Sequence, residues 1–364
     1  MFFRPAGLAT GIGSLPFTEP QEALQVVFES VPFIPHWPQL PRRGKEEGFV
    51  FQFLHPLVKT GVLTVEDGRA YFDTGSPAWA ERLTEFYGLC LRAQEEGQEG
   101  GGGAGALAEF APPHRAAAGL WAFLETVGKS GTGEALYFKG QIAGPLTVGF
   151  ALKDERGHPA YYDRQLRELL RTALALAARW QALALARLGR PAVVFIDDPA
   201  VNVYGQASFI TVTREMIAED LEEIIRAVHA EGGLAGVHSC DAVDWSIFFA
   251  LGLDIVNLDA YSFGESLFPF AREAQAFLER GGVLAWGIVP TSGAAREESV
   301  ESLLGRLSRL WEELARRGVR RDLLREQCLI TPACGTGLLE PELARRIYRL
   351  TAGAAEEVRR GWGA

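Results

Sequence analysis

Eight short apolar runs, mostly separated by longer segments of helical periodicity, constrain the fold of this chain more than any other feature of its sequence. The apolar runs span residues 7–12, 33–36, 136–142, 192–196, 234–237, 254–258, 283–288 and 328–331. They show little alternation of apolar and polar residues, which is typical of parallel strands buried on both faces. Helical patterns cover residues 19–31, 77–96, 115–127, 161–188, 213–230, 244–251, 264–280, 296–317 and 341–359. This order predicts an α/β fold, a single (β/α)8 TIM barrel spanning residues 1–364, with a doubly wound sheet as the alternative.

Two stretches interrupt the regular order of strands and helices. Residues 44–75 form a long excursion in which the runs 62–65 and 70–72 flank a turn sequence, predicting a β-hairpin over the barrel mouth. Residues 97–105 are rich in glycine but contain no lysine and no P-loop pattern, which argues against phosphate binding there.

Composition excludes several classes of protein. The net charge of −10 does not support a nucleic-acid-binding surface. Four cysteines in 364 residues are too few for a disulfide framework, so we expect a reducing, cytoplasmic setting. The N-terminus lacks the pattern of a signal peptide, and no apolar run approaches the length of a membrane span, so we expect no membrane association.

Polar residues follow nearly every predicted strand. In a (β/α)8 barrel the functional residues lie at the carboxyl ends of the strands, so these positions form the candidate site. They are Ser14, Trp37, Gln39, Gln141, Asp197, Asp198, His238, Cys240, Asp259 and Cys334.

His238 and Cys240 begin a possible metal site, because residues two apart on an extended chain point to the same side. Cys334 follows the last predicted strand and could reach the same point at the barrel mouth. Asp259 could add a carboxylate oxygen, although a helix N-cap explains it equally well. Two thiols and an imidazole favour zinc over magnesium or calcium. The alternative is a core cysteine beside a hydrogen-bonded histidine.

Several of these stretches resemble motifs of cobalamin-independent methionine synthase. The matching segments are His238-Ser239-Cys240, residues 254–259, residues 331–337, Gly13-Ser14-Leu15-Pro16, residues 196–200 and residues 141–145. The resemblance extends in patches over nearly the whole chain, and its three-part zinc motif is the specific element. The wider superfamily includes uroporphyrinogen decarboxylase and the corrinoid:coenzyme M methyltransferases on the same barrel.

The resemblance implies a zinc-dependent transfer of a methyl group to a thiol, with homocysteine as acceptor and methionine as product. His238, Cys240, Cys334 and Asp259 would hold the zinc, and the first three would be the catalytic residues. Ser14 would bind the carboxylate of the amino acid and Asp197 its ammonium group, with Gln141 and Trp37 as further substrate-binding positions.

Two departures from the family pattern qualify these expectations. Asp259 stands where the family has a glutamate ligand, so its coordination of zinc is in doubt. The large enzymes have a second barrel that helps to hold folate, and this chain has only one, so a corrinoid or a corrinoid protein is the expected methyl donor. The glutamate that helps to bind the amino acid could be Glu46 or Glu47, although exposed surface carboxylates are the expected interpretation of both.

Three rival functions remain open at this point. Coenzyme M could be the thiol acceptor at the same zinc. A metal-free decarboxylase of the uroporphyrinogen type would instead need arginines around the mouth, and few follow the predicted strands. A zinc-storing or corrinoid-binding protein without activity is the non-enzymatic alternative.

Overall fold

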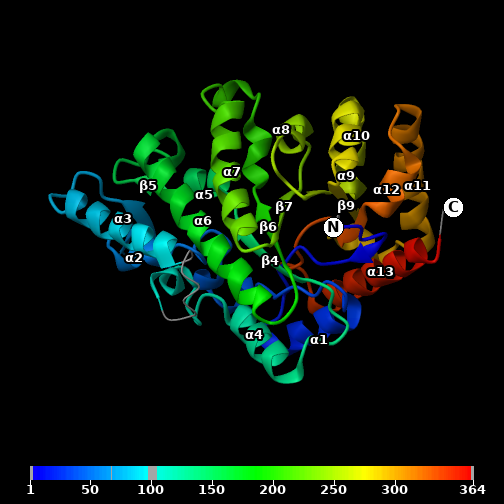
Figure 1. Cartoon of the computed structure of the whole chain (residues 1–364), viewed down its shortest axis with the longest axis horizontal. Coiled ribbons are helices and arrows are strands. Elements are labelled where there is room, and N and C mark those ends of the chain that lie inside the picture. The colour runs from blue at the N-terminus through cyan, green and yellow to red at the C-terminus, as the bar shows by residue number, and fades with distance from the viewer. Residues whose placement is uncertain (1–2, 67, 97–104, 362–364) are drawn as a thin grey trace.

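A parallel sheet of seven strands forms the centre of the computed structural model, which describes residues 3–66, 68–96 and 105–361 (Figure 1). The strand order is β1-β10-β9-β8-β7-β6-β4, and every neighbouring pair is parallel. The strands are β1 (Leu8–Ala9), β4 (Phe138–Ala143), β6 (Ala192–Asp197), β7 (Leu234–Ser239), β8 (Ile255–Leu258), β9 (Val283–Val289) and β10 (Cys328–Pro332). The α/β class and the parallel sheet are therefore confirmed.

Helices follow the strands and surround the sheet (Figure 1). They are α1 (Pro20–Ser30), α2 (His55–Lys59), α3 (Trp79–Glu96), α4 (Ala118–Ser130), α5 (Pro145–Ala151), α6 (Arg164–Ala186), α7 (Arg214–Ala230), α8 (Trp245–Ala250), α9 (Ala260–Phe263), α10 (Ala271–Glu279), α11 (Val300–Arg316), α12 (Arg321–Glu326) and α13 (Pro341–Arg359). The helix expected over residues 264–280 is divided, because Pro269 lies in a 3-10 turn, Gly264–Phe270, ahead of α10. Among the described residues, no helix combines the length and hydrophobicity needed to cross a lipid bilayer.

The eighth strand, expected at residues 33–36, does not form as a regular strand. Proline occupies every third position from Pro32 to Pro41, and each proline removes a donor that a ladder would need. The segment makes isolated parallel bridges instead, His36 with Lys139 of β4 and Ser14 with Gln39. Residues 33–39 thus lie between the two edges of the sheet and join β4 to the end of β1, which gives a curled sheet close to a barrel.

The interior of this curled sheet is filled by a small apolar cluster distinct from the large core under the helices. Its buried members are Phe3, Ile34, Val193, Phe195, Ile255, Val283, Ala285 and Leu329. Alternate residues of β6 point to the same face of the sheet, so Asp197 lies on the same side as Val193 and Phe195 of the cluster. Its carboxylate therefore lies directly above the cluster. The Lys139 ammonium lies 4.6 Å from the centre of the Phe195 ring and belongs to the same layer.

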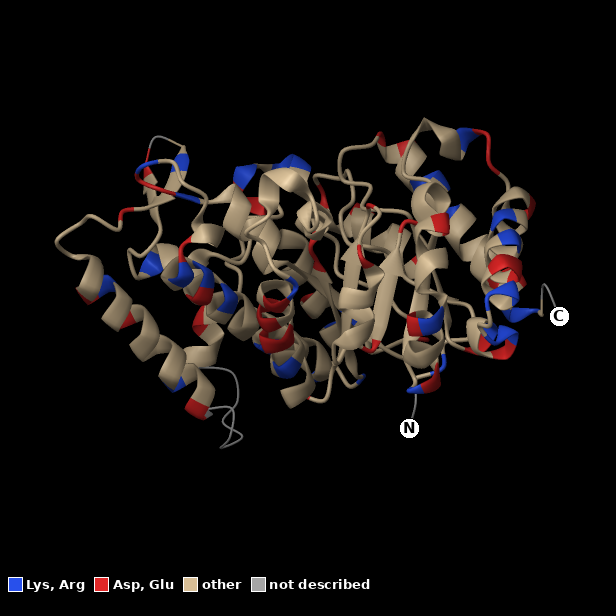
Figure 2. Ribbon diagram, turned by 90° about the horizontal axis from the view of Figure 1, so that it is seen from above, with Lys and Arg blue, Asp and Glu red and all other residues tan. Residues whose placement is uncertain are grey.

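The excursion contains the expected hairpin, formed by β2 (Thr64–Glu66) and β3 (Arg69–Phe72) as an antiparallel pair. A third short strand, β5 (Lys153–Asp154), pairs parallel with β3. Charged side chains lie mainly on the outer helices and loops, and the central strands carry few (Figure 2). The prediction for the glycine-rich stretch falls on residues 97–104, which lie outside the described part of the chain.

Candidate functional site

Three potential metal ligands meet at the carboxyl ends of β7 and β10. His238 is on β7, Cys240 directly follows that strand, and Cys334 lies two residues beyond β10. One ligand atom from each lies within 4.8 Å of those of the other two. The predicted His-x-Cys pair and the distant third cysteine therefore share one point in space. The two thiols are partly exposed, and the imidazole is buried.

The orientation of the His238 ring is set by Asn257 on the adjacent strand. His238 Nδ1 is hydrogen-bonded to Asn257 Oδ1. The Asn257 amide nitrogen donates to Ala285 O at 2.9 Å and Thr331 Oγ1 at 2.8 Å, which identifies its oxygen as the atom facing His238. Nδ1 is then the protonated ring nitrogen, and the lone pair of Nε2 is free. Nε2 is buried with no hydrogen-bond partner, so it is available to bind a metal ion.

The thiols of Cys240 and Cys334 are hydrogen-bonded to each other. Donation from the Cys334 thiol, together with the neighbouring His238, lowers the pKa of Cys240 to about 4. The same hydrogen bond and burial raise the pKa of Cys334. Burial would lower the pKa of His238, but Cys240 and Asp197 beside it outweigh burial and raise it. Two thiols and a buried imidazole nitrogen without a hydrogen-bond partner suit a Zn²⁺ ion, which binds thiolates and neutral imidazole.

Asp259, the fourth expected ligand, does not join this group. Its Oδ1 accepts a hydrogen bond of 2.8 Å from Ser262 N, and it is the N-cap of α9. Within the described chain, the cluster of ligand atoms that lie within 4.8 Å of one another contains His238, Cys240 and Cys334 and leaves Asp259 out. The capping geometry therefore accounts for Asp259 without a metal.

A cavity of about 480 Å³ opens beside the three ligands. Its lining residues come from the ends of several strands and from the segment after residue 40: Ile12, Ser14, Gln39, Pro41, Glu47, Phe49, Asp197, Pro199, His238, Cys240, Thr291, Cys334, Gly335, Gly337, Leu338 and Leu339. A volume of this size is ordinary for a small-molecule site. No lysine or arginine is among these described lining residues.

Asp197 and Asp198, adjacent in sequence, have different roles. Asp198 accepts hydrogen bonds from Leu146 N, Thr147 N and Thr147 Oγ1, so it holds the start of α5. Asp197 lines the cavity, is 6% exposed, and its Oδ1 has no hydrogen-bond partner. Burial raises the pKa of Asp197 to about 6, and the nearby His238 and Lys139 only partly offset this. Asp197 is therefore the carboxylate available to a ligand.

Ser14 is held at the cavity wall by the turn that carries Cys334. Its carbonyl oxygen accepts from Thr336 N and Thr336 Oγ1, both at 2.9 Å, and its hydroxyl oxygen accepts from Gly337 N at 3.2 Å. A Cβ atom at Gly335 would lie 2.2 Å from Ser14 Oγ, so any other residue there would force the Ser14 hydroxyl to move. The predicted substrate loop and the predicted metal loop thus form one packed unit.

Trp37 and Gln141, the other two expected substrate-binding residues, are not among the residues that line the cavity. The Trp37 ring is fully buried and its indole nitrogen donates to Gln181 Oε1 at 2.7 Å. Gln141 is also fully buried, and its amide donates to Trp37 O at 3.2 Å. The Gln141 side chain packs against Gly13, whereas the Trp37 ring contacts Gln181 and Phe53.

Glu47 is a cavity residue that sequence reasoning had placed on the surface. It is 2% exposed, and its Oε1 accepts from Arg43 Nε at 2.7 Å and from Ala118 N at 3.4 Å. Its Oε2 is buried with no partner, and burial raises the pKa of Glu47. Glu46, the other candidate, is exposed and paired with Arg115 at 2.6 Å.

Lys139 was missed entirely, although a lone lysine within the apolar run 136–142 was a visible signal. It is fully buried, and its ammonium group donates to Ile12 O and, at 3.2 Å, to Gln141 Oε1. Burial lowers the pKa of Lys139 to about 7, and Asp197 partly opposes this shift. Lys139 thus anchors the residue that leads into the Gly13–Ser14 turn.

No family model matches the chain, and no curated protein matches it. Among solved structures, the chain is similar to a B12-independent methionine synthase from Shewanella sp. W3-18-1, determined in complex with selenomethionine. The identity is 16%, the TM-score is 0.44, and the match covers 65% of this chain and 67% of that one. At this TM-score and identity, the likeness establishes neither the fold nor the function of the chain.

Proposed function

We propose that this protein is a zinc-dependent methyltransferase that moves a methyl group to the thiol of homocysteine and so forms methionine. One observation carries the proposal: Glu47 Oε2, Asp197 Oδ1 and His238 Nε2 are buried atoms without hydrogen-bond partners, and all three residues line one cavity. Buried polar groups are normally satisfied, so three such atoms around one cavity support the proposal that it takes a ligand and a metal.

His238, Cys240 and Cys334 would hold the metal, leaving a fourth position open to a substrate, as catalytic zinc sites do. Zinc bound there would supply a Lewis acid that lowers the pKa of a coordinated substrate thiol, making it a nucleophile near neutral pH. Because Asn257 accepts from Nδ1 of His238, Nε2 would be the ring nitrogen that holds the metal.

The remaining lining residues suit the amino-acid end of homocysteine. Glu47 and Asp197 each offer an unpartnered carboxylate oxygen, which an ammonium group would satisfy. Ser14, which lines the same cavity, offers its hydroxyl for the substrate carboxylate. Among the described residues, the cavity lining contains two carboxylates and no lysine or arginine, which favours an ammonium-bearing thiol over a thiol that carries only a sulfonate, such as coenzyme M. The same walls disfavour a decarboxylase acting on a substrate with many carboxylates.

The experiment is to incubate zinc-loaded protein with methylcobalamin and one of three thiols: homocysteine, coenzyme M, or 4-mercaptobutyrate, which lacks the amino group of homocysteine. Methylated product is measured by mass spectrometry, with the metal-free protein as control. We expect methionine to form fastest, and only with zinc. Turnover of coenzyme M in preference to homocysteine would identify coenzyme M as the methyl acceptor. Equal turnover without zinc would refute the metal-dependent mechanism.

A further inference from the structure

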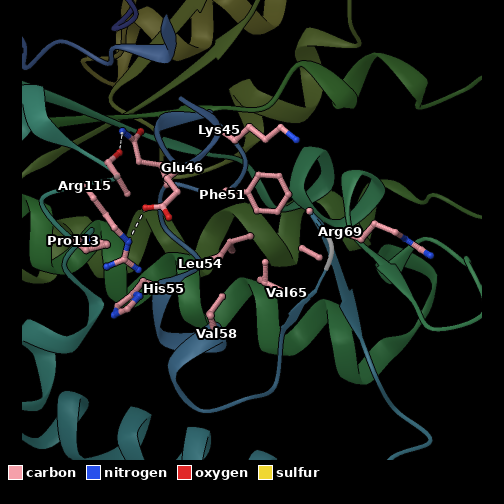
Figure 3. Close-up of a pocket in the computed structure, with 14 residues that line it drawn as sticks. Lys45, Glu46, Phe51, Leu54, His55, Val58, Val65, Arg69, Pro113 and Arg115 are labelled. Atoms are coloured by element: carbon pink, nitrogen blue, oxygen red, sulfur yellow. Dashed lines mark hydrogen bonds and ion pairs between the residues drawn. The ribbon is translucent and has the colours of Figure 1, made fainter. Parts of the chain in front are cut away.

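A second cavity, of about 240 Å³, lies under the β2–β3 hairpin and is separate from the site described above (Figure 3). We call it the hairpin cavity. Its lining residues are Lys45, Glu46, Phe51, Gln52, Leu54, His55, Val58, Val65, Gly68, Arg69, Ala70, Pro113, Arg115 and Ala116. None of them lines the cavity beside the cysteines, so the two sites have separate walls.

The hairpin cavity gathers exposed apolar side chains. Phe51 is 43% exposed, Val58 38% and Val65 54%, and all three project around its centre (Figure 3). Single exposed hydrophobic residues are ordinary, but three around one concavity indicate a surface that is covered by something else in use. The buried Leu54 completes the apolar lining.

Cations surround this apolar centre. Three basic residues line the hairpin cavity, Lys45, Arg69 and Arg115, and Glu46 is the acidic residue in the same lining. Lys45 and Arg69 have no ion-pair partner within the described residues, and their charged ends extend outward at the rim (Figure 3). Arg115 pairs with Glu46, but both side chains are 62% exposed, and exposed pairs contribute little stability. An anion could therefore displace Glu46 from Arg115. The local excess of cations is notable in a chain whose net charge is −10.

A short segment separates the two cavities and contributes alternately to each. Glu46 and Phe51 line the hairpin cavity, whereas Glu47 and Phe49 line the cavity beside the cysteines. Gln52 crosses this partition: its Oε1 accepts from Gln39 at 2.8 Å, and its amide nitrogen donates to Ala116 O at 2.6 Å. The hairpin cavity therefore sits on a supported wall and not on a loosely packed loop.

We propose that the hairpin cavity binds a small molecule with an apolar body and one carboxylate group. The apolar body would lie among Phe51, Val58 and Val65. The carboxylate would replace Glu46 as the ion-pair partner of the Arg115 guanidinium. A cavity of about 150 Å³ accommodates benzene, so this larger one has room for a ring and an acid group. The proposal is independent of the function assigned to the zinc-binding residues.

The test uses three probes that share one ring and differ in charge: phenylacetate, phenylacetamide and phenethylamine. Binding to the full chain is measured by isothermal titration calorimetry and by saturation-transfer NMR. We expect phenylacetate to bind best, with one molecule per chain, the amide about tenfold more weakly because it forms no charged hydrogen bond, and the amine not at all.

Matched variants locate the binding site. Phe51→Glu should abolish phenylacetate binding, and Leu91→Glu, the same kind of change at an exposed position of α3, should leave it intact. Arg115→Gln should weaken phenylacetate about tenfold and leave phenylacetamide unchanged. Cys334→Ala should bind phenylacetate like the parent protein, which separates this result from any failure at the metal site.

Three outcomes would overturn the proposal. One is the absence of phenylacetate binding, and another is equal binding of the acid and the amide. The third is a concentration-dependent dimer in light scattering that Phe51→Glu dissociates, because the apolar patch would then be an interface between two copies of the chain. Circular dichroism of each variant verifies that the fold is retained.

Discussion

Asn257 Oδ1 accepts the Nδ1 hydrogen of His238, and this contact fixes which nitrogen of the imidazole faces the cysteines. The two residues are paired directly in the register of β7 and β8, so the contact is a consequence of strand alignment. Asp197 is paired with His238 in the same way on the other side. The row Asp197, His238, Asn257 thus places an acid, a proposed metal ligand and its orienting partner on three adjacent strands.

We predict that Asn257→Leu weakens zinc binding by about 10- to 100-fold, because the ring loses the acceptor that fixes its tautomer and orientation. Zinc affinity is measured by competition with a chromogenic chelator. Asn257→Asp is the matched control, since it keeps an acceptor at the same position and should retain zinc. Equal affinity in the leucine variant would show that Asn257 does not position His238.

The four cysteines offer an internal control for the proposed metal site. We predict that Cys240→Ala and Cys334→Ala each abolish zinc retention, whereas Cys90→Ala retains about one zinc per chain. Cys90 is buried on α3, where burial raises the pKa of its thiol to about 12, so it serves packing. Elemental analysis of purified proteins gives the answer, and zinc retained in both site variants would contradict the assignment.

Asp259 can be tested as a cap and as a ligand separately. Asp259→Asn preserves the capping hydrogen bond to Ser262 N but removes the charge, whereas Asp259→Ala removes both. If capping is its role, we expect Asp259→Asn to keep zinc and Asp259→Ala to lose about 1 kcal/mol of stability with little loss of zinc. Loss of zinc in Asp259→Asn would restore it as a ligand.

Strand positions and strand ends were predictable from the sequence, because buried parallel strands are continuous apolar runs. β6, β9 and β10 begin at the expected residues, 192, 283 and 328, and end within one residue of expectation. The run at 33–36 was misread as a strand, since its apolar side chains resemble one while its prolines prevent the ladder. A prediction of strands from apolar runs alone therefore overestimates the number of strands that pair regularly in the sheet.

Burial in the site depends on contacts that are distant in sequence. Glu47 appears exposed in a charged stretch, but Ala118 N, 71 residues away, donates to it and α4 begins there. Trp37 appears free to meet a ligand, but Gln181, 144 residues away, satisfies its indole nitrogen. Neither contact can be recognised from the residues that neighbour Glu47 or Trp37 in the sequence. Lys139 did leave a local signal, because lysine in a buried strand requires partners.

We predict that Glu47→Gln raises KM for homocysteine about 10- to 100-fold, since a charged hydrogen bond to the ammonium group becomes a neutral one. The diagnostic measurement is the ratio of kcat/KM for homocysteine to that for 4-mercaptobutyrate, which has no ammonium. This ratio should fall in Glu47→Gln and stay unchanged in Glu46→Gln, where the side chain is exposed. An unchanged ratio in both would remove Glu47 from the substrate site.

Asp220 provides a pH-dependent test of the fold, away from the cavity. It lies on α7, 3.5 Å from both Arg167 and Arg171 of α6, and burial raises its pKa to about 7 despite these arginines. A carboxyl whose pKa is higher in the folded state than in the unfolded state binds more protons when folded. The stability it contributes is therefore lost as pH rises between about 4 and 7.

Asp220→Asn cannot titrate, so its stability relative to the parent protein should improve by about 2 kcal/mol from pH 5 to pH 8. Urea unfolding of both proteins at the two pH values measures this difference. Because all other groups are common to both proteins, their pH dependence cancels. A difference that stays constant, or changes in the opposite direction, would contradict the raised pKa of Asp220.

The final prediction concerns the methyl donor. No lysine or arginine lines the cavity among the described residues, and the chain carries a net charge of −10, so nothing at the site attracts a polyanionic folate tail. A methyl group on a corrinoid is also a better electrophile than one on an unprotonated folate nitrogen, and it requires less activation from the enzyme. We therefore expect methionine to form from methylcobalamin or a methylated corrinoid protein, and little or none from methyltetrahydrofolate. Each donor is supplied with homocysteine and methionine is quantified, with Cys334→Ala as the inactive control. Efficient use of methyltetrahydrofolate without any corrinoid would overturn the donor assignment while leaving the acceptor site intact.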